Sequence, residues 1–180
     1  KESSAASDVY KRQLAIQCFI VYLGLLKVFT GLNPFKFIKN FFPVMAFAFS
    51  TATSNATIPL SIDTLAKKMG VSKKISSFTI PLGATINMDG TAIMQGVAVV
   101  FIAQAYGIPL TPAAIATVIA TATIASIGTA GVPSVGLVTL SMVLTSVGLP
   151  TEGIALIMGI DRILDMLRTA VNITGDAVCT

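Results

Sequence analysis

Long apolar runs separated by short polar breaks make up the chain from residue 14 onward. Residues 14–30 form the first run, which is long enough for most of a transmembrane helix. Residues 35–69 contain two apolar arms that meet at a Ser/Thr/Asn-rich segment, residues 50–59. Lysines flank both ends of this pair of arms, so the positive-inside rule places both ends on the cytoplasmic side. We therefore expect a helical hairpin that enters the membrane and returns.

The second half of the chain repeats this arrangement. We expect residues 74–107 to form one crossing that is broken at residues 83–91, where Asn, Asp, Gly and Thr interrupt the apolar pattern. Residues 111–148 again form two apolar arms, and without flanking lysine or arginine this hairpin should enter from the outer side. Residues 152–180 form the last helix. Two hairpins of opposite orientation, each followed by a polar or interrupted helix, are typical of inverted repeats in secondary transporters.

The last helix carries a narrow polar stripe. At about 100° per residue, a face roughly 80° wide collects Asp161, Asp165, Arg168, Asn172 and Asp176. A surface helix could expose such a stripe to water, but ionisable side chains inside a bilayer mark substrate or ion sites. Arg168 offers a planar fork for a carboxylate, and Asp165 offers an acceptor for an ammonium group. These residues favour a carrier of an acidic amino acid, whereas Asp161 is better explained by an ion pair that positions the helix.

Composition places this pattern in a lipid bilayer. The chain has 54% hydrophobic and 11% charged residues, whereas a soluble domain has about 25% charged residues. Asp89 is the only charged residue between Ile75 and Thr151. The chain has no histidine, and Cys18 and Cys179 show no metal-binding or pairing pattern, so a hydrolase triad or zinc site is not expected. No basic patch with interleaved aromatics supports nucleic-acid binding.

The break in the crossing helix suggests a coupling ion. An interrupted helix releases backbone carbonyls, which are hard oxygen ligands suited to sodium or protons. Asp89 lies in this break, and Asp176 lies on the polar stripe, so either carboxylate could neutralise a bound cation. We expect Na+ or H+ as the coupling ion and no further cofactor.

The first twelve residues differ abruptly from the rest. The segment Lys1 to Arg12 is polar, and the string SSAASDVYKRQ resembles translated sequencing-adapter sequence. We expect residues 1–12 to be a non-native or disordered tail, with a native cytoplasmic or extracellular tail as the alternative. The fold would then begin at residue 13.

Three motifs in order closely resemble the dicarboxylate/amino acid:cation symporter family, which includes the glutamate and aspartate transporters. They are Asn87-Met88-Asp89-Gly90-Thr91, the tip from Ala125 to Pro133, and the stripe from Asp161 to Asp176. The resemblance implies an all-α, multi-pass protein of the cell (inner) membrane with two oppositely oriented re-entrant hairpins, working as an elevator-type homotrimer. Residues 13–180 would be most of its transport domain. The N-terminal scaffold helices would be missing, so the fragment would not transport unaided.

The resemblance also assigns a binding site for an acidic amino acid. Arg168 would bind the side-chain carboxylate of the substrate, and Asp165 its amino group. The second hairpin would be the extracellular gate. The other contacts would come from Thr91, Thr169, Asn172, Ser54 and the backbone at Ala52, Val132 and Gly136.

Three sodium sites are implied in the same way. The first would use carbonyls of Gly83, Asn87 and Asn172 with the carboxylate of Asp176. The second, under the gate, would use Thr85, Met88, Ser126, Ile127 and Thr129. The third would involve Asn87 and Asp89.

Two departures concern the first hairpin. Its tip reads Thr53-Ser54-Asn55 where many members have three serines, and Ala52 stands where some have an arginine, a charge that Arg162 would supply instead. The expected function is uptake of aspartate or glutamate coupled to Na+ or H+. A cystine or C4-dicarboxylate symporter is the alternative within the family. A structural membrane bundle or a membrane enzyme is the alternative from another class.

Overall fold

The computed structural model describes the backbone of residues 2–180 and the side chains from residue 5 onward. All regular secondary structure in this part of the chain is helical. From the N-terminus the elements are α1 (Glu2–Ala15), the π-helix η1 (Ile16–Tyr22), α2 (Leu23–Thr30), α3 (Pro34–Thr51), α4 (Ser54–Met69), α5 (Lys73–Ile86), α6 (Asp89–Ala105), α7 (Pro112–Ser126), α8 (Val135–Ser146), the 3₁₀-helix η2 (Thr151–Ile154) and α9 (Ala155–Val178).

The N-terminal segment differs from the expected tail. Residues 2–12 are helical and continue through η1 into α2. The reason is packing: Tyr10 is 1% exposed, and its hydroxyl donates to the Gly90 carbonyl at 3.1 Å. The structure thus packs the described part of this segment against the bundle, and its non-native origin stays a prediction. Lys1 lies outside the described residues.

The first hairpin consists of α3 and α4. Asn33 starts α3 because its side-chain oxygen accepts from the backbone N–H groups of Phe35 and Lys36, with Pro34 at the first helical position. At the base of the hairpin, the Asn40 side-chain amide donates to the Lys68 carbonyl at 3.4 Å. The two helices therefore run antiparallel, with their polar tip at the opposite end.

The crossing helix breaks between α5 and α6. Asn87 and Met88 leave helical geometry, with φ/ψ of −107°/72° and −113°/54°. This break lies inside the segment 83–91, where the sequence predicts one. Backbone groups freed at this point must find partners, because lipid offers none.

The second hairpin consists of α7 and α8. Thr111 starts α7, since its hydroxyl accepts from the Ala114 N–H at 3.1 Å and Pro112 occupies the first helical position. The tip between the helices is irregular, and Ser134 adopts a left-handed conformation with φ 60° just before α8. Backbone groups of the tip can therefore bond to segments outside this hairpin.

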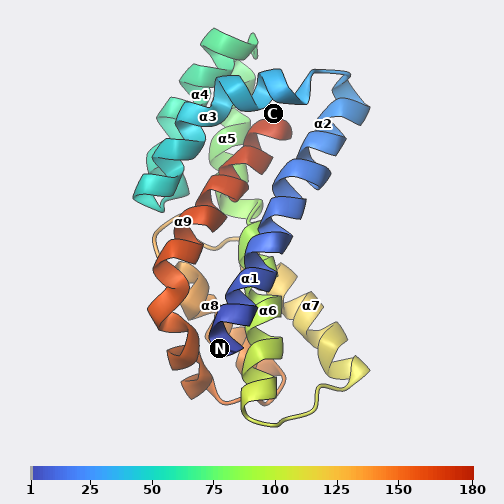
Figure 1. Ribbon diagram of the computed structural model, residues 1–180. Helices are drawn as coiled ribbons and strands as arrows, with labels where there is room; N and C mark the ends of the chain where they lie inside the picture. The colour runs from blue at the N-terminus through green and yellow to red at the C-terminus, as the bar shows by residue number, and fades with distance from the viewer. Residues whose placement is uncertain (1) are drawn as a thin grey trace.

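The two hairpins lie at opposite ends of the bundle, with α9 running between them (Figure 1). One apolar cluster joins α1, α6, α8 and α9, and a second joins α3, α4 and α5 to the C-terminal part of α9. Their fully buried members include Ile102, Leu140 and Leu144 in the first and Phe41, Val44 and Leu65 in the second. The middle of α9, between the clusters, is where the polar residues gather.

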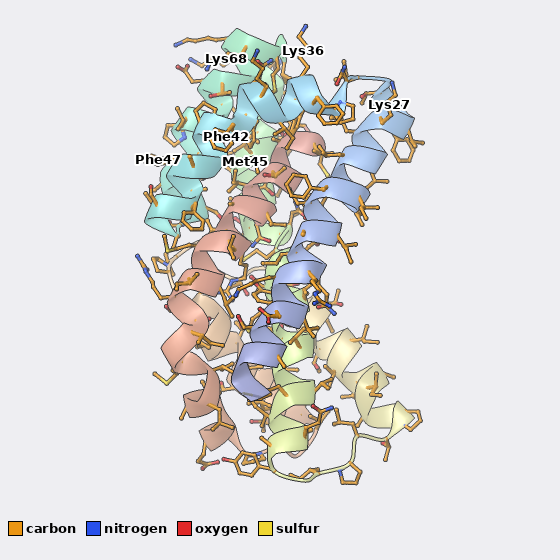
Figure 2. The ribbon with its side chains drawn as sticks, viewed as in Figure 1. Lys27, Lys36, Phe42, Met45, Phe47 and Lys68 are labelled. Atoms are coloured by element: carbon orange, nitrogen blue, oxygen red, sulfur yellow. The ribbon has the colours of Figure 1, made fainter. Side chains whose placement is uncertain are left out.

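The outside of the bundle suits a membrane. Two described segments, Ala5–Thr30 and Lys73–Ala105, are long and apolar enough to cross one, and α7 and α8 are shorter apolar helices. Large apolar side chains such as Phe29 and Phe78 point outward. Figure 2 shows Lys27, Lys36 and Lys68 together at one end of the molecule. This clustering is what the positive-inside rule requires of a cytoplasmic end.

Candidate functional site

The polar stripe of α9 faces the protein interior. Its five members are all buried: Asp161, Asp165, Arg168, Asn172 and Asp176. A solvated surface helix would show the opposite orientation. Charged groups kept away from water need partners of opposite charge or hydrogen-bonding ligands.

Arg168 is the centre of this arrangement and is 2% exposed. Its Nη2 donates to Oδ1 of Asp165 at 2.5 Å, and its Nη1 lies 3.7 Å from Oδ1 of Asp161. Among the described residues, neither Nη1 nor Asp161 Oδ2 has a hydrogen-bond partner. Buried guanidinium groups are nearly always fully hydrogen-bonded, so an unmet donor here is where a ligand acceptor would bind.

The second hairpin closes over this ion pair. The backbone N–H of Ser134 donates to Oδ2 of Asp165 at 2.8 Å. A Cβ placed on Gly136 would lie 3.1 Å from Cζ of Arg168 and 2.8 Å from Cε of Met94. The start of α8 therefore sits directly against the guanidinium, and a side chain at residue 136 would have to push Arg168 and Met94 aside.

The tips of the two hairpins meet at Gly131. Its carbonyl accepts from the Thr53 hydroxyl at 2.5 Å and from the Asn55 N–H at 3.4 Å. A Cβ at this position would lie 3.1 Å from Cβ of Ser54 and 2.9 Å from Oδ1 of Asn55. The tips of the two hairpins, about 75 residues apart in sequence, are thus in direct contact.

A cavity of about 20 Å³ lies where the tips, the break and the polar stripe meet. This space holds about one water molecule, so an amino acid would need the tips to part. The lining contains eight of the nine expected substrate residues: Ala52, Ser54, Thr91, Val132, Asp165, Arg168, Thr169 and Asn172. Gly136, the ninth, lies against Arg168 as described above. Met88, expected as a cation ligand, also lines the cavity, together with the unpredicted Ala130, Gly131 and Val135.

Residues expected at the first sodium site lie together beside this cavity. Oδ1 of Asp176 accepts from the side-chain amide of Asn87 at 2.9 Å, and a Cβ on Gly83 would lie 2.7 Å from the same oxygen. The side-chain oxygen of Asn172 accepts from the Gly90 N–H at 2.9 Å. These contacts tie α9 to both ends of the helix break.

Residues expected at the second sodium site lie where the second hairpin contacts the break. The Gly128 N–H donates to the Thr85 carbonyl at 2.9 Å. Ser126 and Thr129 are buried beside it, and their hydroxyls donate to the carbonyls of Thr123 and Ala125. Ile127 has no ligand atom in its side chain, which is 54% exposed, so only its backbone could contribute.

Asp89, expected at the third site, has partners that the sequence did not predict. Its Oδ2 accepts from Nε2 of Gln17 at 2.7 Å and from the hydroxyl of Tyr22 at 2.9 Å. A polar Gln17 inside an apolar run was the available signal for this contact. Arg162, by contrast, is exposed and lies outside the cavity lining.

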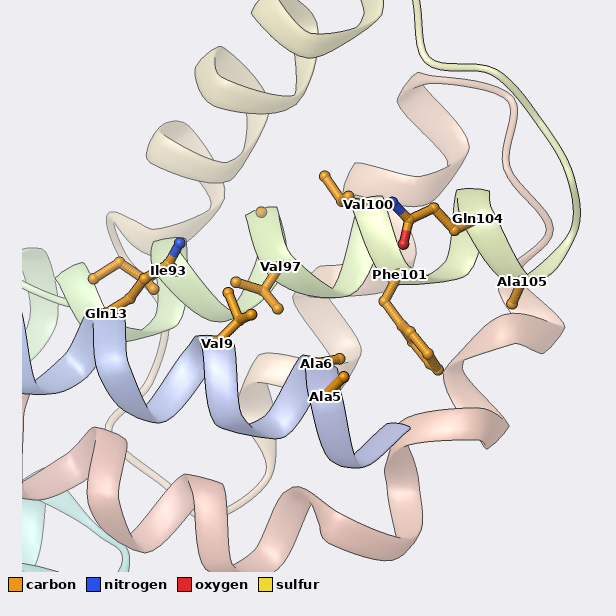
Figure 3. A pocket seen from close by; sticks show the side chains of 11 residues that line it. Ala5, Ala6, Val9, Gln13, Ile93, Val97, Val100, Phe101, Gln104 and Ala105 are labelled. Atoms are coloured by element: carbon orange, nitrogen blue, oxygen red, sulfur yellow. The ribbon is translucent and has the colours of Figure 1, made fainter. Parts of the chain in front are cut away.

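A wider groove of about 640 Å³ runs between α1 and α6 and is less suited to this chemistry. Figure 3 shows its walls, where Val9 and Ala6 face Val97. Among the residues whose side chains are described, from residue 5 onward, the lining contains no charged side chain, and Gln13 and Gln104 are its only polar ones. Without a charged group among the described lining residues to hold a carboxylate, the groove is not the candidate site.

The close approach of α5 to Asp176 leads to a stability prediction. We expect Gly83→Ala to destabilise the protein by about 1–3 kcal/mol, because the added methyl would overlap the carboxylate in a packed interior. Gly96→Ala is the matched control in α6, where a Cβ meets nothing within 4 Å. Unfolding in detergent measures both, and a Gly83→Ala variant as stable as Gly96→Ala would show that α5 and α9 are not this close.

Comparison with known proteins places the chain among membrane transporters. Residues 9–180 match the Sodium:dicarboxylate symporter family. The chain is 43% identical to Excitatory amino acid transporter 2 of Homo sapiens, over 94% of this chain and 32% of that protein. It is 46% identical to an Excitatory amino acid transporter of Caenorhabditis elegans, over 92% and 33%, and 47% identical to Excitatory amino acid transporter 4 of Mus musculus, over 83% and 27%. The chain thus spans about a third of the length of these relatives.

Proposed function

The chain belongs to the sodium:dicarboxylate symporter family, a family of membrane transporters and not of enzymes, and from this premise we propose that its complete protein takes up aspartate or glutamate by symport with sodium. Residues 13–180 would form most of the transport domain of an elevator-type homotrimer in the cell (inner) membrane. Scaffold helices elsewhere in the complete protein would hold the trimer together. The single observation that carries the proposal is the buried Arg168 with an unmet donor beside Asp165.

The Arg168–Asp165 pair explains why an acidic amino acid fits. Without a ligand, the two charges neutralise each other at 2.5 Å. In a ligand with a side-chain carboxylate and an ammonium group, the carboxylate can pair with Arg168 in place of Asp165, and the ammonium can pair with Asp165 in place of Arg168. Neither residue is then left unpaired in the interior. A plain dicarboxylate lacks the ammonium for Asp165, and a neutral amino acid lacks the side-chain carboxylate for Arg168. Both should therefore bind more weakly.

Sodium coupling is supported by oxygen donors around the helix break. The carboxylate of Asp176 lies beside Asn87, and Asn172 contributes both to this group and to the cavity lining. A cation held here would neutralise a buried charge and order the break that forms one wall of the cavity. Binding of sodium and binding of the amino acid would thus favour the same conformation, which is the basis of symport.

The second hairpin would act as the gate. Its tip is held by two hydrogen bonds, from Gly128 to Thr85 and from Ser134 to Asp165, and by the contact of Gly131 with the first hairpin. The amino acid would displace the Ser134 contact on entering, and the tip would then close over it. The lipid-facing hairpin arms need not rearrange for this local movement.

Uptake into proteoliposomes by the complete protein tests this proposal. With an inward sodium gradient we expect accumulation of labelled L-aspartate, and with a proton gradient alone we expect none. In competition, L-glutamate should inhibit strongly and succinate weakly. Stronger inhibition by succinate or cystine would instead indicate a C4-dicarboxylate or cystine symporter. Uptake driven equally well by a proton gradient alone would contradict sodium coupling.

A further inference from the structure

Helix η1 has an unusual geometry at the point where it faces the helix break. Residues Ile16–Tyr22 form a π-helix between two α-helical segments. π-Helices are rare, appear mostly as single turns inside α-helices, and occur frequently at functional sites. The side chain of Cys18 here is buried but makes no polar contact among the described residues that would explain the turn. The polar contacts of η1 come from Gln17 and Tyr22.

The π-turn brings Gln17 and Tyr22 onto one face. In an α-helix, residues five positions apart differ by about 500°, which leaves them about 140° apart around the axis. In a π-helix the hydrogen-bond partner is the fifth residue, so side chains five apart lie nearly above each other. Gln17 and Tyr22 are five apart, and both donate to the same oxygen, Oδ2 of Asp89, at 2.7 and 2.9 Å. An α-helical turn would direct only one of them to this carboxylate.

The Tyr22 hydroxyl also packs against Gly175 on α9. A Cβ on Gly175 would lie 2.5 Å from the Tyr22 hydroxyl and 2.8 Å from Nδ2 of Asn87. The hydroxyl therefore donates to Asp89 and lies close to the Asn87 amide, which in turn donates to Asp176. This position is open only because residue 175 has no side chain.

We propose that η1 is a positioning element for the cation-binding part of the transporter, with Gln17 and Tyr22 as positioning residues that orient the Asp89 carboxylate. Both donors hold Oδ2, so Oδ1 is the oxygen that would remain for a cation. This inference rests on the proposed function, because it presumes that Asp89 serves a transported cation. Neither residue lines the substrate cavity, so the effect on sodium should be separable from the effect on the amino acid.

The test uses the purified complete protein with Tyr22→Phe, Gln17→Met and the double variant. The readout is thermal stability during titration with sodium chloride against choline chloride at constant ionic strength, without amino acid. We expect the sodium concentration for half-maximal stabilisation to rise about 10-fold in each single variant, the lower end of the range for partners that orient metal ligands. Aspartate affinity at saturating sodium should stay close to wild type.

Matched controls separate positioning from a general structural role. Tyr106→Phe and Gln104→Met make the same chemical changes at exposed positions and should leave the sodium titration unchanged. A merely structural role would lower stability in choline and leave the half-maximal sodium concentration unmoved, which would overturn the inference. A wild-type protein that sodium does not stabilise would overturn the proposed function as well, and the two failures are thereby distinguishable.

Discussion

Replacing Arg168 with glutamine is expected to abolish aspartate uptake by the complete protein. The guanidinium is buried and is the only cation among the described residues that line the cavity, so the side-chain carboxylate of the substrate would lose its partner. Removing one member of a buried charge pair costs about 3–5 kcal/mol, which corresponds to more than roughly 100-fold in affinity. Binding of labelled aspartate in the presence of sodium measures this loss directly.

Two further variants show whether the loss comes from binding or from folding. Arg168→Gln leaves Asp161 and Asp165 without their cation, which could destabilise the helix. Arg168→Lys keeps the charge but not the planar fork, so it should fold and still bind aspartate at least ~10-fold more weakly. Arg162→Gln, an exposed position on the same helix, should bind as wild type. Undiminished aspartate affinity in either Arg168 variant would contradict the assignment.

Replacing Asp176 with asparagine is expected to remove most of the sodium dependence of aspartate binding. The side chain is almost unchanged in shape, but the buried negative charge beside Asn87 disappears. Losing a ligand charge should exceed the effect of losing an orienting partner, so the half-maximal sodium concentration should rise by at least ~10-fold. Aspartate binding titrated with sodium at fixed aspartate measures the change.

Asp63→Asn is the matched control for this substitution. The Asp63 side chain is 49% exposed and pairs with Lys67 at 2.5 Å on α4, away from the cavity lining, so its loss should affect neither sodium nor aspartate binding. Equal sodium dependence in Asp176→Asn and in wild type would show that this carboxylate does not serve the coupling ion. The Asn87–Asp176 contact would then be purely structural.

Periodicity makes part of this architecture readable from the sequence. The stripe on α9 follows from five polar residues at helical spacing in an otherwise apolar chain, and the structure places all five inside. The break before α6 is equally visible, since Asn87 and Asp89 interrupt a long apolar run. In both places a polar group in an apolar setting is costly, and this cost makes the pattern informative.

Other features depend on long-range packing that no local pattern records. The π-helical turn of η1 has no sequence signature, and the pairing of Gln17 with Asp89 joins residues 72 positions apart. The contact between the hairpin tips depends on a single glycine, Gly131, in a segment with several. Helix α1 was expected to be a tail because its polar composition hides the burial of Tyr10.

The most direct test of the central claim is equilibrium binding of labelled L-aspartate to the purified complete protein in sodium and in choline. We predict saturable binding in sodium, little binding in choline, and loss of binding in sodium when Arg168 is replaced by glutamine. Equal binding in choline, or retained binding without the guanidinium, would mean that the buried pair on α9 does not form the site of a sodium-coupled carrier.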